Sequence, residues 1–252
     1  MSDTVPAQAN APMTASHTQP VRWYADGTRE AWARRAAEAI AAALASDLDA
    51  NGRSLLLLAA GNTALTVYRK LAAAALPWHR VTVALAEERW TTPGSAHGNE
   101  AAIRGSLLNG PAAHATLVPL VAQLDDPALA ARAASQQLRE LALTPAAVVL
   151  GMDEDGHVAG LFARAGGLDH ALASAEPYAA IDALGCEAAG RWPTRISATP
   201  ALIQSAGQRF LLLQGASRRR SFEQALTGGD VGAMSVRCTL SGHAPLQVHW
   251  CP

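Results

Sequence analysis

The spacing of apolar residues predicts an alternation of helices and strands. Over residues 29–48 the bulky apolar side chains fall on one helix face and charged residues fall elsewhere, which predicts an amphipathic helix. The uninterrupted apolar run 55–58 then predicts a strand buried on both faces of a sheet. After a glycine-containing turn, apolar residues recur at helical spacing over 65–75, and Asn62 or Thr63 is suited to cap that helix.

The same order of elements repeats through the rest of the chain. The predicted elements are a strand at 81–85, a polar loop at 87–97, a helix at 98–108, a short strand near 116–120, a helix at 127–143, a strand at 147–150, a strand at 209–213, a helix at 217–226, and strands at 236–240 and 246–250. Residues 158–162 can begin a further helix, while 166–190 show no clear pattern. Strands that alternate with helices predict an α/β fold with a mostly parallel sheet covered by helices on both faces.

This alternation also predicts where a ligand binds. Parallel sheets of this kind bind ligands beyond the carboxyl ends of their strands. The segments that emerge there are 59–63, 87–99, 151–157 and 215–218. We therefore look for chemistry in these four segments.

Composition narrows the class of protein. Half of the 252 residues are apolar, 16% are charged and the formal net charge is −1, so we expect a globular protein without a nucleic-acid or membrane partner. Residues 1–20 are rich in Ala, Pro, Thr, Ser and Gln and lack a signal-peptide pattern, which predicts a disordered leader before a single domain at 21–252. The three cysteines lie far apart without metal-ligand spacing, which favours a reducing cytoplasm and no metal.

The segment after the predicted strand 147–150 holds the strongest catalytic candidate, His157. Its sequence is Gly-Met-Asp-Glu-Asp-Gly-His. Histidine titrates near neutral pH, so His157 can take a proton from water, and Asp155 can orient its ring. The same position also suits a histidine that only caps a helix, and the residues alone leave both interpretations open.

Three further features suggest an anion site. The turn Gly61-Asn62-Thr63 offers backbone N–H groups at a helix N-terminus, although many such turns are purely structural. Arg89, in Glu87-Glu88-Arg89, can make paired hydrogen bonds to a phosphate or a sugar carboxylate, but such a tripeptide is more often a surface charge cluster. Arg195 and Arg218 are additional candidates.

Several motifs of other enzyme classes are absent from the sequence. It has no Gly-x-Ser-x-Gly and no His-Glu-x-x-His, and it has neither Gly-x-Gly-x-x-Gly nor a Walker A pattern. No cofactor is therefore expected. We expect a small-molecule partner and a monomer or small homo-oligomer.

Taken in order, these segments resemble the 6-phosphogluconolactonase family, within the glucosamine-6-phosphate isomerase/6-phosphogluconolactonase superfamily, across most of residues 21–250. Residues 151–162 resemble the family signature Gly-Met-Gly-x-Asp-Gly-His-Thr/Val-Ala-Ser-Leu-Phe. The other matches are residues 59–64 with Ser-Gly-Gly-Ser-Thr-Pro, Glu87-Glu88-Arg89 with Asp-Glu-Arg, Asn99 with the Asn that follows it, Pro193-x-Arg195-Ile196-Ser197 with Pro-x-Arg-Ile-Thr, and Gly215-x-x-Arg218 with Gly-x-x-Lys. The resemblance implies a modified Rossmann-like fold.

This chain departs from the family pattern at five positions. Ala60 and Ala64 replace a Gly and the Pro of the phosphate turn, and Glu87 replaces Asp. Asp153 replaces Gly, and Arg218 replaces Lys. A Cβ at a glycine position can crowd backbone or ligand, and Arg keeps the charge of Lys with a different donor geometry.

The resemblance implies metal-free hydrolysis of 6-phosphoglucono-δ-lactone to 6-phosphogluconate in the oxidative pentose phosphate pathway. In that reaction His157 would activate water and return a proton to the ring oxygen. The roles implied for the other residues are phosphate binding by Arg89 and Arg218 with the turn Gly61-Asn62-Thr63, and shaping of the sugar site by Arg195 and Asn99. Glu87 is a further expected substrate-binding residue.

Two alternatives remain. The first is a sugar-phosphate deaminase or isomerase of the same fold, whose Asp-Gly-His motif runs into Ala-Phe-Asn-Glu-Pro, whereas here the motif runs into Val158-Ala159-Gly160-Leu161-Phe162. The second is a non-catalytic sugar-phosphate sensor, which usually carries an appended helix-turn-helix, and the 20-residue leader is too short for one.

Overall fold

The structure is a computed structural model that describes residues 21–121 and 126–252. The leader expected at 1–20 lies outside these residues. The helices of the described part are α1 (Arg29–Asn51), α2 (Asn62–Leu71), α3 (Asn99–Ser106), α4 (Pro127–Glu140), α5 (Leu168–Ala173), α6 (Pro200–Ser205) and α7 (Ala216–Leu226). Its strands are β1 (Val21–Ala25), β2 (Ser54–Leu58), β3 (Val81–Leu85), β4 (Glu87–Arg89), β5 (Thr116–Leu117), β6 (Pro145–Gly151), β7 (Tyr178–Asp182), β8 (Thr194–Ala198), β9 (Gln208–Gln214) and β10 (Leu246–Cys251).

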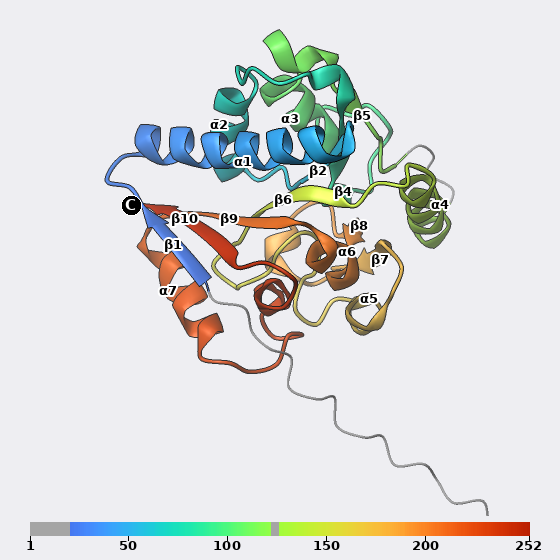
Figure 1. Cartoon of the computed structure of the whole chain (residues 1–252). Coiled ribbons are helices and arrows are strands. Elements are labelled where there is room, and N and C mark those ends of the chain that lie inside the picture. The colour runs from blue at the N-terminus through green and yellow to red at the C-terminus, as the bar shows by residue number, and fades with distance from the viewer. Residues whose placement is uncertain (1–20, 122–125) are drawn as a thin grey trace, which may run out of the picture.

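The main sheet has seven strands in the order β1-β10-β9-β6-β2-β3-β5, and every neighbouring pair is parallel. Helices α1 and α2 cover one face, and α7 lies on the other (Figure 1). The predicted α/β class, with a mostly parallel sheet between layers of helices, is therefore confirmed.

Helix α1 shows how local sequence sets these elements. It begins where the Thr28 hydroxyl accepts a hydrogen bond from the Ala31 N–H at 3.2 Å, and it ends at Gly52, whose φ of 73° favours glycine. Trp32, Ile40 and Leu44 point into the core and are fully buried. The apolar stripe read from the sequence is thus the face that packs on the sheet.

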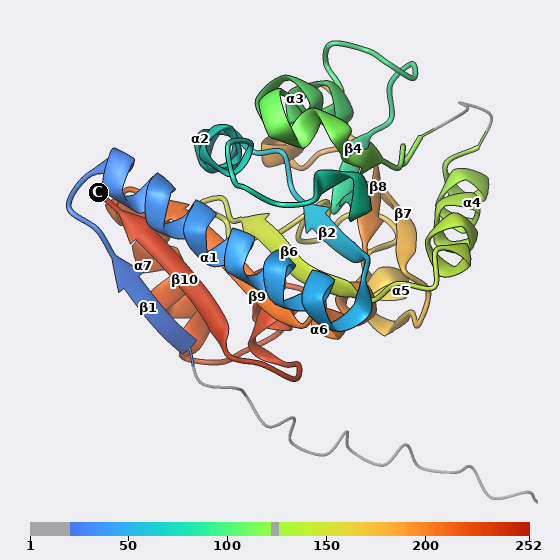
Figure 2. The ribbon, with the colours of Figure 1, turned by 45° about the horizontal axis from the view of Figure 1, so that its top comes forward.

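A second, smaller sheet was not foreseen. Strands β4, β8 and β7 pair antiparallel in that order, and α4 packs against β7 and β8 on the outer side of this sheet (Figure 2). Strand β4 occupies the start of the segment predicted as a polar loop at 87–97. This sheet carries Glu87 and Arg195, and its β4–β8 register places Glu87 opposite Ser197 and Arg89 opposite Arg195.

Three local predictions were wrong. Residues 236–240 form part of a 3-10 helix, η4 (Ser235–Leu240), instead of a strand. Residues 158–162 form turns and extended backbone and do not begin a helix. Helix α2 has Gly61 as its N-cap and no side-chain cap, so neither Asn62 nor Thr63 plays that part.

Candidate active site

Four segments meet at the carboxyl edge of the main sheet, as the alternation of elements predicts. They follow β2, β3, β6 and β9, which lie near one another at the centre of the sheet. Together they surround a cavity of about 200 Å³. Its lining comprises Ala59, Gly61, Asn62, Thr63, Glu87, Gly151, Met152, Asp153, His157, Ala159 and Arg218.

The turn that carries His157 is fixed on several sides. Met152 and Val158 pair in an antiparallel bridge, and Gly156 closes the turn between them with a φ of 81°. The Val158 N–H donates to the Ser235 hydroxyl at 3.1 Å, and the Gly160 N–H donates to the Ser197 hydroxyl at 3.0 Å. The backbone that follows His157 is therefore tied to neighbouring elements, which limits the movement of this turn.

The His157 ring is itself oriented. Its Nδ1 lies 2.7 Å from Asp155 Oδ1, and the same oxygen accepts the His157 backbone N–H at 3.1 Å. The ring packs on Phe162 with 4.3 Å between the centroids. A carboxylate at Nδ1 favours the tautomer with its proton on Nδ1, which leaves Nε2 with a lone pair for a base.

The charge of Asp155 supports this arrangement. Burial acts to raise the pKa of Asp155, but the hydrogen bond and the charge of His157 together outweigh it, so the pKa lies below its usual value. Asp155 is therefore ionised at neutral pH and acts as an acceptor toward the imidazole. The sequence-predicted pair of His157 and Asp155 is brought together at the cavity.

Backbone groups at the start of α2 line the same cavity as His157. The first turn of α2 begins at the cavity wall, where the N–H groups of Asn62 and Thr63 belong to the unbonded start of the helix. The helix dipole adds positive potential at this end. Ala64 is fully buried, Ala60 is buried, and neither residue lines the cavity.

Arg218 brings the guanidinium of α7 to the same cavity. Its Nη2 and Nε lie 2.6 Å and 3.2 Å from Asp153 Oδ1. Both side chains are partly exposed, with 32% and 49% of their surface accessible. Two of the departures named above, Asp153 and Arg218, thus form an ion pair with each other.

Glu87 is held in place by two of the predicted site residues. The Asn99 side-chain amide donates to the Glu87 carbonyl at 3.0 Å and to its Oε1 at 2.5 Å. Arg195 Nε lies 3.2 Å from Glu87 Oε2 in an ion pair that is poorly aligned for a hydrogen bond. Asn99 and Arg195 are buried behind the lining, so Glu87 is the member of this group that faces the cavity.

The other nitrogen atoms of the Arg195 guanidinium also bind groups of the protein. Its guanidinium donates to the carbonyls of Trp192 at 2.5 Å and Ala189 at 3.0 Å. It also lies 5.5 Å from the centre of the Phe162 ring. These contacts leave Arg195 as a support for the site wall.

Arg89 lies outside the lining of the cavity. Its Nη1 donates to the carbonyl of His97 at 2.7 Å. The neighbouring Glu88 is buried and accepts the backbone N–H groups of Asn99 and Glu100 at 2.6 and 2.7 Å, so it caps α3. Burial raises the pKa of Glu88 in spite of these bonds. Of the tripeptide 87–89, only Glu87 reaches the cavity.

Sequence reasoning missed four residues that matter to the site. Ser197 and Ser235 hold the backbone beside His157, Phe162 supports its ring, and Glu88 caps α3. Ser197 and Phe162 lie within the quoted family motifs, but nothing in their local sequence indicates these contacts. Ser235 acts from 77 positions away along the chain, and only the fold brings it near.

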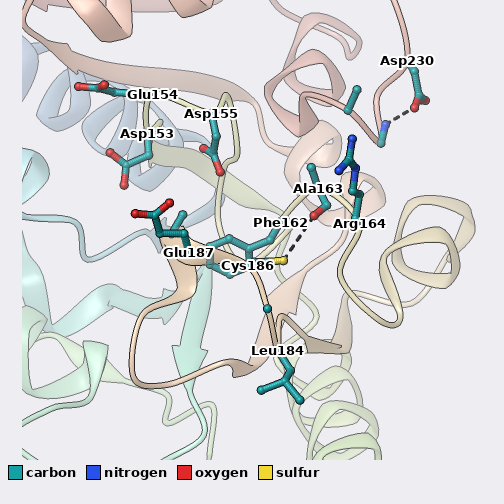
Figure 3. A pocket seen from close by; sticks show the side chains of 14 residues that line it. Asp153, Glu154, Asp155, Phe162, Ala163, Arg164, Leu184, Cys186, Glu187 and Asp230 are labelled. Carbon is teal, nitrogen blue, oxygen red and sulfur yellow. Dashed lines mark hydrogen bonds between the residues drawn. The ribbon is translucent and has the colours of Figure 1, made fainter.

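A larger cavity of about 1080 Å³ adjoins the site and shares Asp153 with it (Figure 3). Acidic side chains predominate among the ionisable residues that line it, and Arg164 is the one basic residue among the described lining residues. The acidic residues are Asp153, Glu154, Asp155, Glu187 and Asp230.

Two features of the described residues bear on metal and membrane binding. Across 21–121 and 126–252, no three His, Cys, Asp or Glu side chains gather where they would suit a metal ion. None of the helices in these same ranges combines the length and the apolar character needed to cross a membrane.

Comparison with known proteins places the chain in a family. Residues 27–250 match the family model described as glucosamine-6-phosphate isomerases/6-phosphogluconolactonase. The chain is 36% identical to a 6-phosphogluconolactonase of Xylella fastidiosa, over 87% of this chain and 92% of that protein, and 34% identical to one of Pseudomonas aeruginosa, over 90% and 93%. A solved 6-phosphogluconolactonase structure from Shewanella baltica superposes with a TM-score of 0.86 at 27% identity, covering 93% of this chain and 99% of that one. The chain therefore belongs to the glucosamine-6-phosphate isomerase/6-phosphogluconolactonase family.

Proposed function

We propose that this protein hydrolyses 6-phosphoglucono-δ-lactone to 6-phosphogluconate. The observation that carries the proposal is one cavity lined by an oriented histidine, His157, by the N-terminus of α2 and by Arg218. The names of the relatives support the substrate, and the order of the site segments along the chain agrees with it.

His157 acts as the general base. Because Asp155 binds Nδ1, Nε2 takes a proton from water as the water oxygen attacks the lactone carbonyl. The bond between the carbonyl carbon and the ring oxygen then breaks, and the proton on Nε2 passes to that oxygen. One water is consumed, the ring opens to a carboxylic acid, and His157 returns to its starting state.

The phosphate binds at the opposite wall. The N–H groups at the start of α2 and the guanidinium of Arg218 are suited to a phosphate dianion. The sugar then lies between this anchor and His157. Glu87, held by Asn99 and Arg195, faces the cavity as an acceptor for sugar hydroxyls. Arg89 lies outside the lining of the cavity and acts, in this proposal, only after movement of its side chain.

The setting of the reaction is part of the proposal. The three cysteines Cys186, Cys238 and Cys251 are free thiols, which fits a reducing cytoplasm. We propose that the protein works there in the oxidative pentose phosphate pathway, as a monomer or small homo-oligomer, without a metal or cofactor.

The direct test is turnover of freshly prepared lactone by the purified protein, measured against spontaneous hydrolysis in the same buffer. Hydrolysis well above the buffer rate is expected. A rate equal to buffer would overturn the proposal. In that case, ammonia release from glucosamine 6-phosphate would identify a deaminase, and binding of 6-phosphogluconate without any turnover would identify a sensor.

A further inference from the structure

Arg218 is already paired before any ligand arrives. Two of its nitrogen atoms lie within 3.2 Å of a single oxygen of Asp153. Among the described residues that line the smaller cavity, Arg218 is the only Arg or Lys. A phosphate that binds at this wall must therefore share or take the one guanidinium that Asp153 holds.

The position of Asp153 lets it compete with a bound phosphate for Arg218. It occupies the first position of the turn that presents His157, where the Gly156 N–H donates to its carbonyl at 3.0 Å. Its carboxylate lies at the border of the two cavities, since Asp153 lines both of them.

The larger cavity makes the competition stronger. A displaced Asp153 side chain has room to turn into it, but Glu154, Asp155 and Glu187 lie there with the same charge (Figure 3). Like charges repel, so Asp153 is favoured on the Arg218 side. Displacing it costs energy that only a ligand with further contacts can offset.

We propose that Asp153 is a specificity-determining residue that competes with ligand phosphate for Arg218. The inference rests on the proposed function for the identity of the substrate. The ion pair between Asp153 and Arg218 is observed independently of that function. Small anions that contact Arg218 alone are held weakly. A sugar phosphate that also contacts the α2 N-terminus and the sugar site displaces Asp153, and the ion pair re-forms as product leaves.

The test is calorimetric titration of the intact protein with inorganic phosphate. Asp153→Asn keeps the shape of the side chain and removes its charge, and it is expected to tighten phosphate binding about tenfold. Glu154→Gln is the matched control, because it removes the same charge from the adjacent residue of the same turn, which does not pair with Arg218. It is expected to change the dissociation constant less than twofold.

Two results would overturn the inference. One is unchanged or weaker phosphate binding in Asp153→Asn, and the other is equal tightening in Glu154→Gln, which would reveal only the general field of the acidic cavity. Asp153→Gly, which restores the family residue, is a second variant with the same expected tightening, and it decides the matter if Asp153→Asn does not fold.

Two further measurements separate this inference from the proposed function. In an Arg218→Gln background, Asp153→Asn is expected to tighten phosphate binding at least threefold less than it does in the wild type, and a full-sized effect there would contradict competition for Arg218. With lactone, Asp153→Asn is expected to raise kcat/KM by lowering KM. If wild-type protein fails to hydrolyse lactone, the proposed function fails while the phosphate titration still decides this inference.

Discussion

At the scale of single residues, the contact between Asp155 and His157 determines which imidazole nitrogen is available. His157 Nδ1 lies 2.7 Å from Asp155 Oδ1, and this same contact with His157 helps to lower the pKa of Asp155. An ionised acceptor at Nδ1 holds the ring in one tautomer and stabilises the imidazolium that forms when Nε2 takes a proton.

Replacing Asp155 by Asn removes that charge while keeping its size. The amide can donate to Nδ1, which favours the wrong tautomer, so kcat for lactone hydrolysis is expected to fall by about 10- to 100-fold with little change in KM. Steady-state kinetics measure this effect. Asp169→Asn, at an exposed position on α5, serves as the control, and an unchanged kcat in Asp155→Asn would contradict the orienting role.

At the scale of elements, the turn that follows β6 presents His157 at the end of a buried strand. Gly156 permits its tight path, because its φ of 81° disfavours other residues and a Cβ there would lie 2.6 Å from Met234 Cε. The Val236 N–H also donates to the Gly156 carbonyl at 3.0 Å. The position of the histidine therefore depends on η4 as well as on its own strand.

Gly156→Ala tests this dependence. The left-handed backbone and the contact with Met234 are expected to lower the free energy of unfolding by about 1–3 kcal/mol and to lower kcat as the turn shifts. Chemical denaturation and kinetics measure both effects. In the double variant with Met234→Ala, part of the loss is expected to be recovered relative to the sum of the single changes, and strict additivity would contradict a clash with Met234.

The elements that sequence predicts well are those whose burial pattern is local. Helix α1 and strand β2 each carry their signal within their own residues, as a helical stripe and as an unbroken apolar run. Residues 236–240 mislead because Val236, Cys238 and Leu240 alternate with Arg237 and Thr239, which is typical of a strand, and five residues are too few to separate the two periods.

The antiparallel sheet was missed for a different reason. Strand β4 is only Glu87–Arg89, three charged residues that read as a loop, and its strand character arises from pairing with β8 more than 100 residues later. Likewise, the predicted phosphate arginine Arg89 lies outside the cavity, because β4 directs it toward His97. Partners that are distant along the chain leave no local pattern.

At the scale of the whole molecule, the parallel sheet brings distant segments to one edge, and this is the part of the site that the sequence predicted best. The segments after β2, β6 and β9 meet because the sheet order places these strands side by side. The ion pair between Asp153 and Arg218, by contrast, could not be predicted from the sequence, because neither residue indicates its partner.

The interior of the sheet also predicts how global stability depends on pH. His249 on β10 is 1% exposed, stacks on Tyr24 with 4.7 Å between ring centroids, and has no hydrogen-bond partner for either nitrogen within the described residues. Burial lowers the pKa of His249 to about 4, with the charge of Asp26 opposing this effect and that of Arg35 adding to it.

The sign of the effect follows from proton uptake. Between about pH 6.5 and pH 4 the unfolded chain binds a proton at His249 that the folded protein does not, so stability falls as pH falls through this range. Below about pH 4 both states are protonated and the loss levels off. The full loss is on the order of 3 kcal/mol.

His249→Phe removes this titration and keeps an aromatic ring against Tyr24. Denaturant unfolding at several pH values is expected to show the wild type losing about 3 kcal/mol more than the variant between pH 6.5 and 4. The comparison uses the slope with pH, so a constant offset from the larger ring does not affect it. Parallel pH profiles for the two proteins would contradict a buried neutral His249.

The central claim is that His157 is the base of a lactone hydrolase, and one comparison tests it most directly. Hydrolysis of fresh 6-phosphoglucono-δ-lactone is measured for wild type, for His157→Asn and for His170→Asn, which alters an exposed histidine on α5. The predicted result is a loss of about 10²- to 10⁴-fold in kcat for His157→Asn alone, with His170→Asn equal to wild type. Wild-type turnover in His157→Asn would contradict the account.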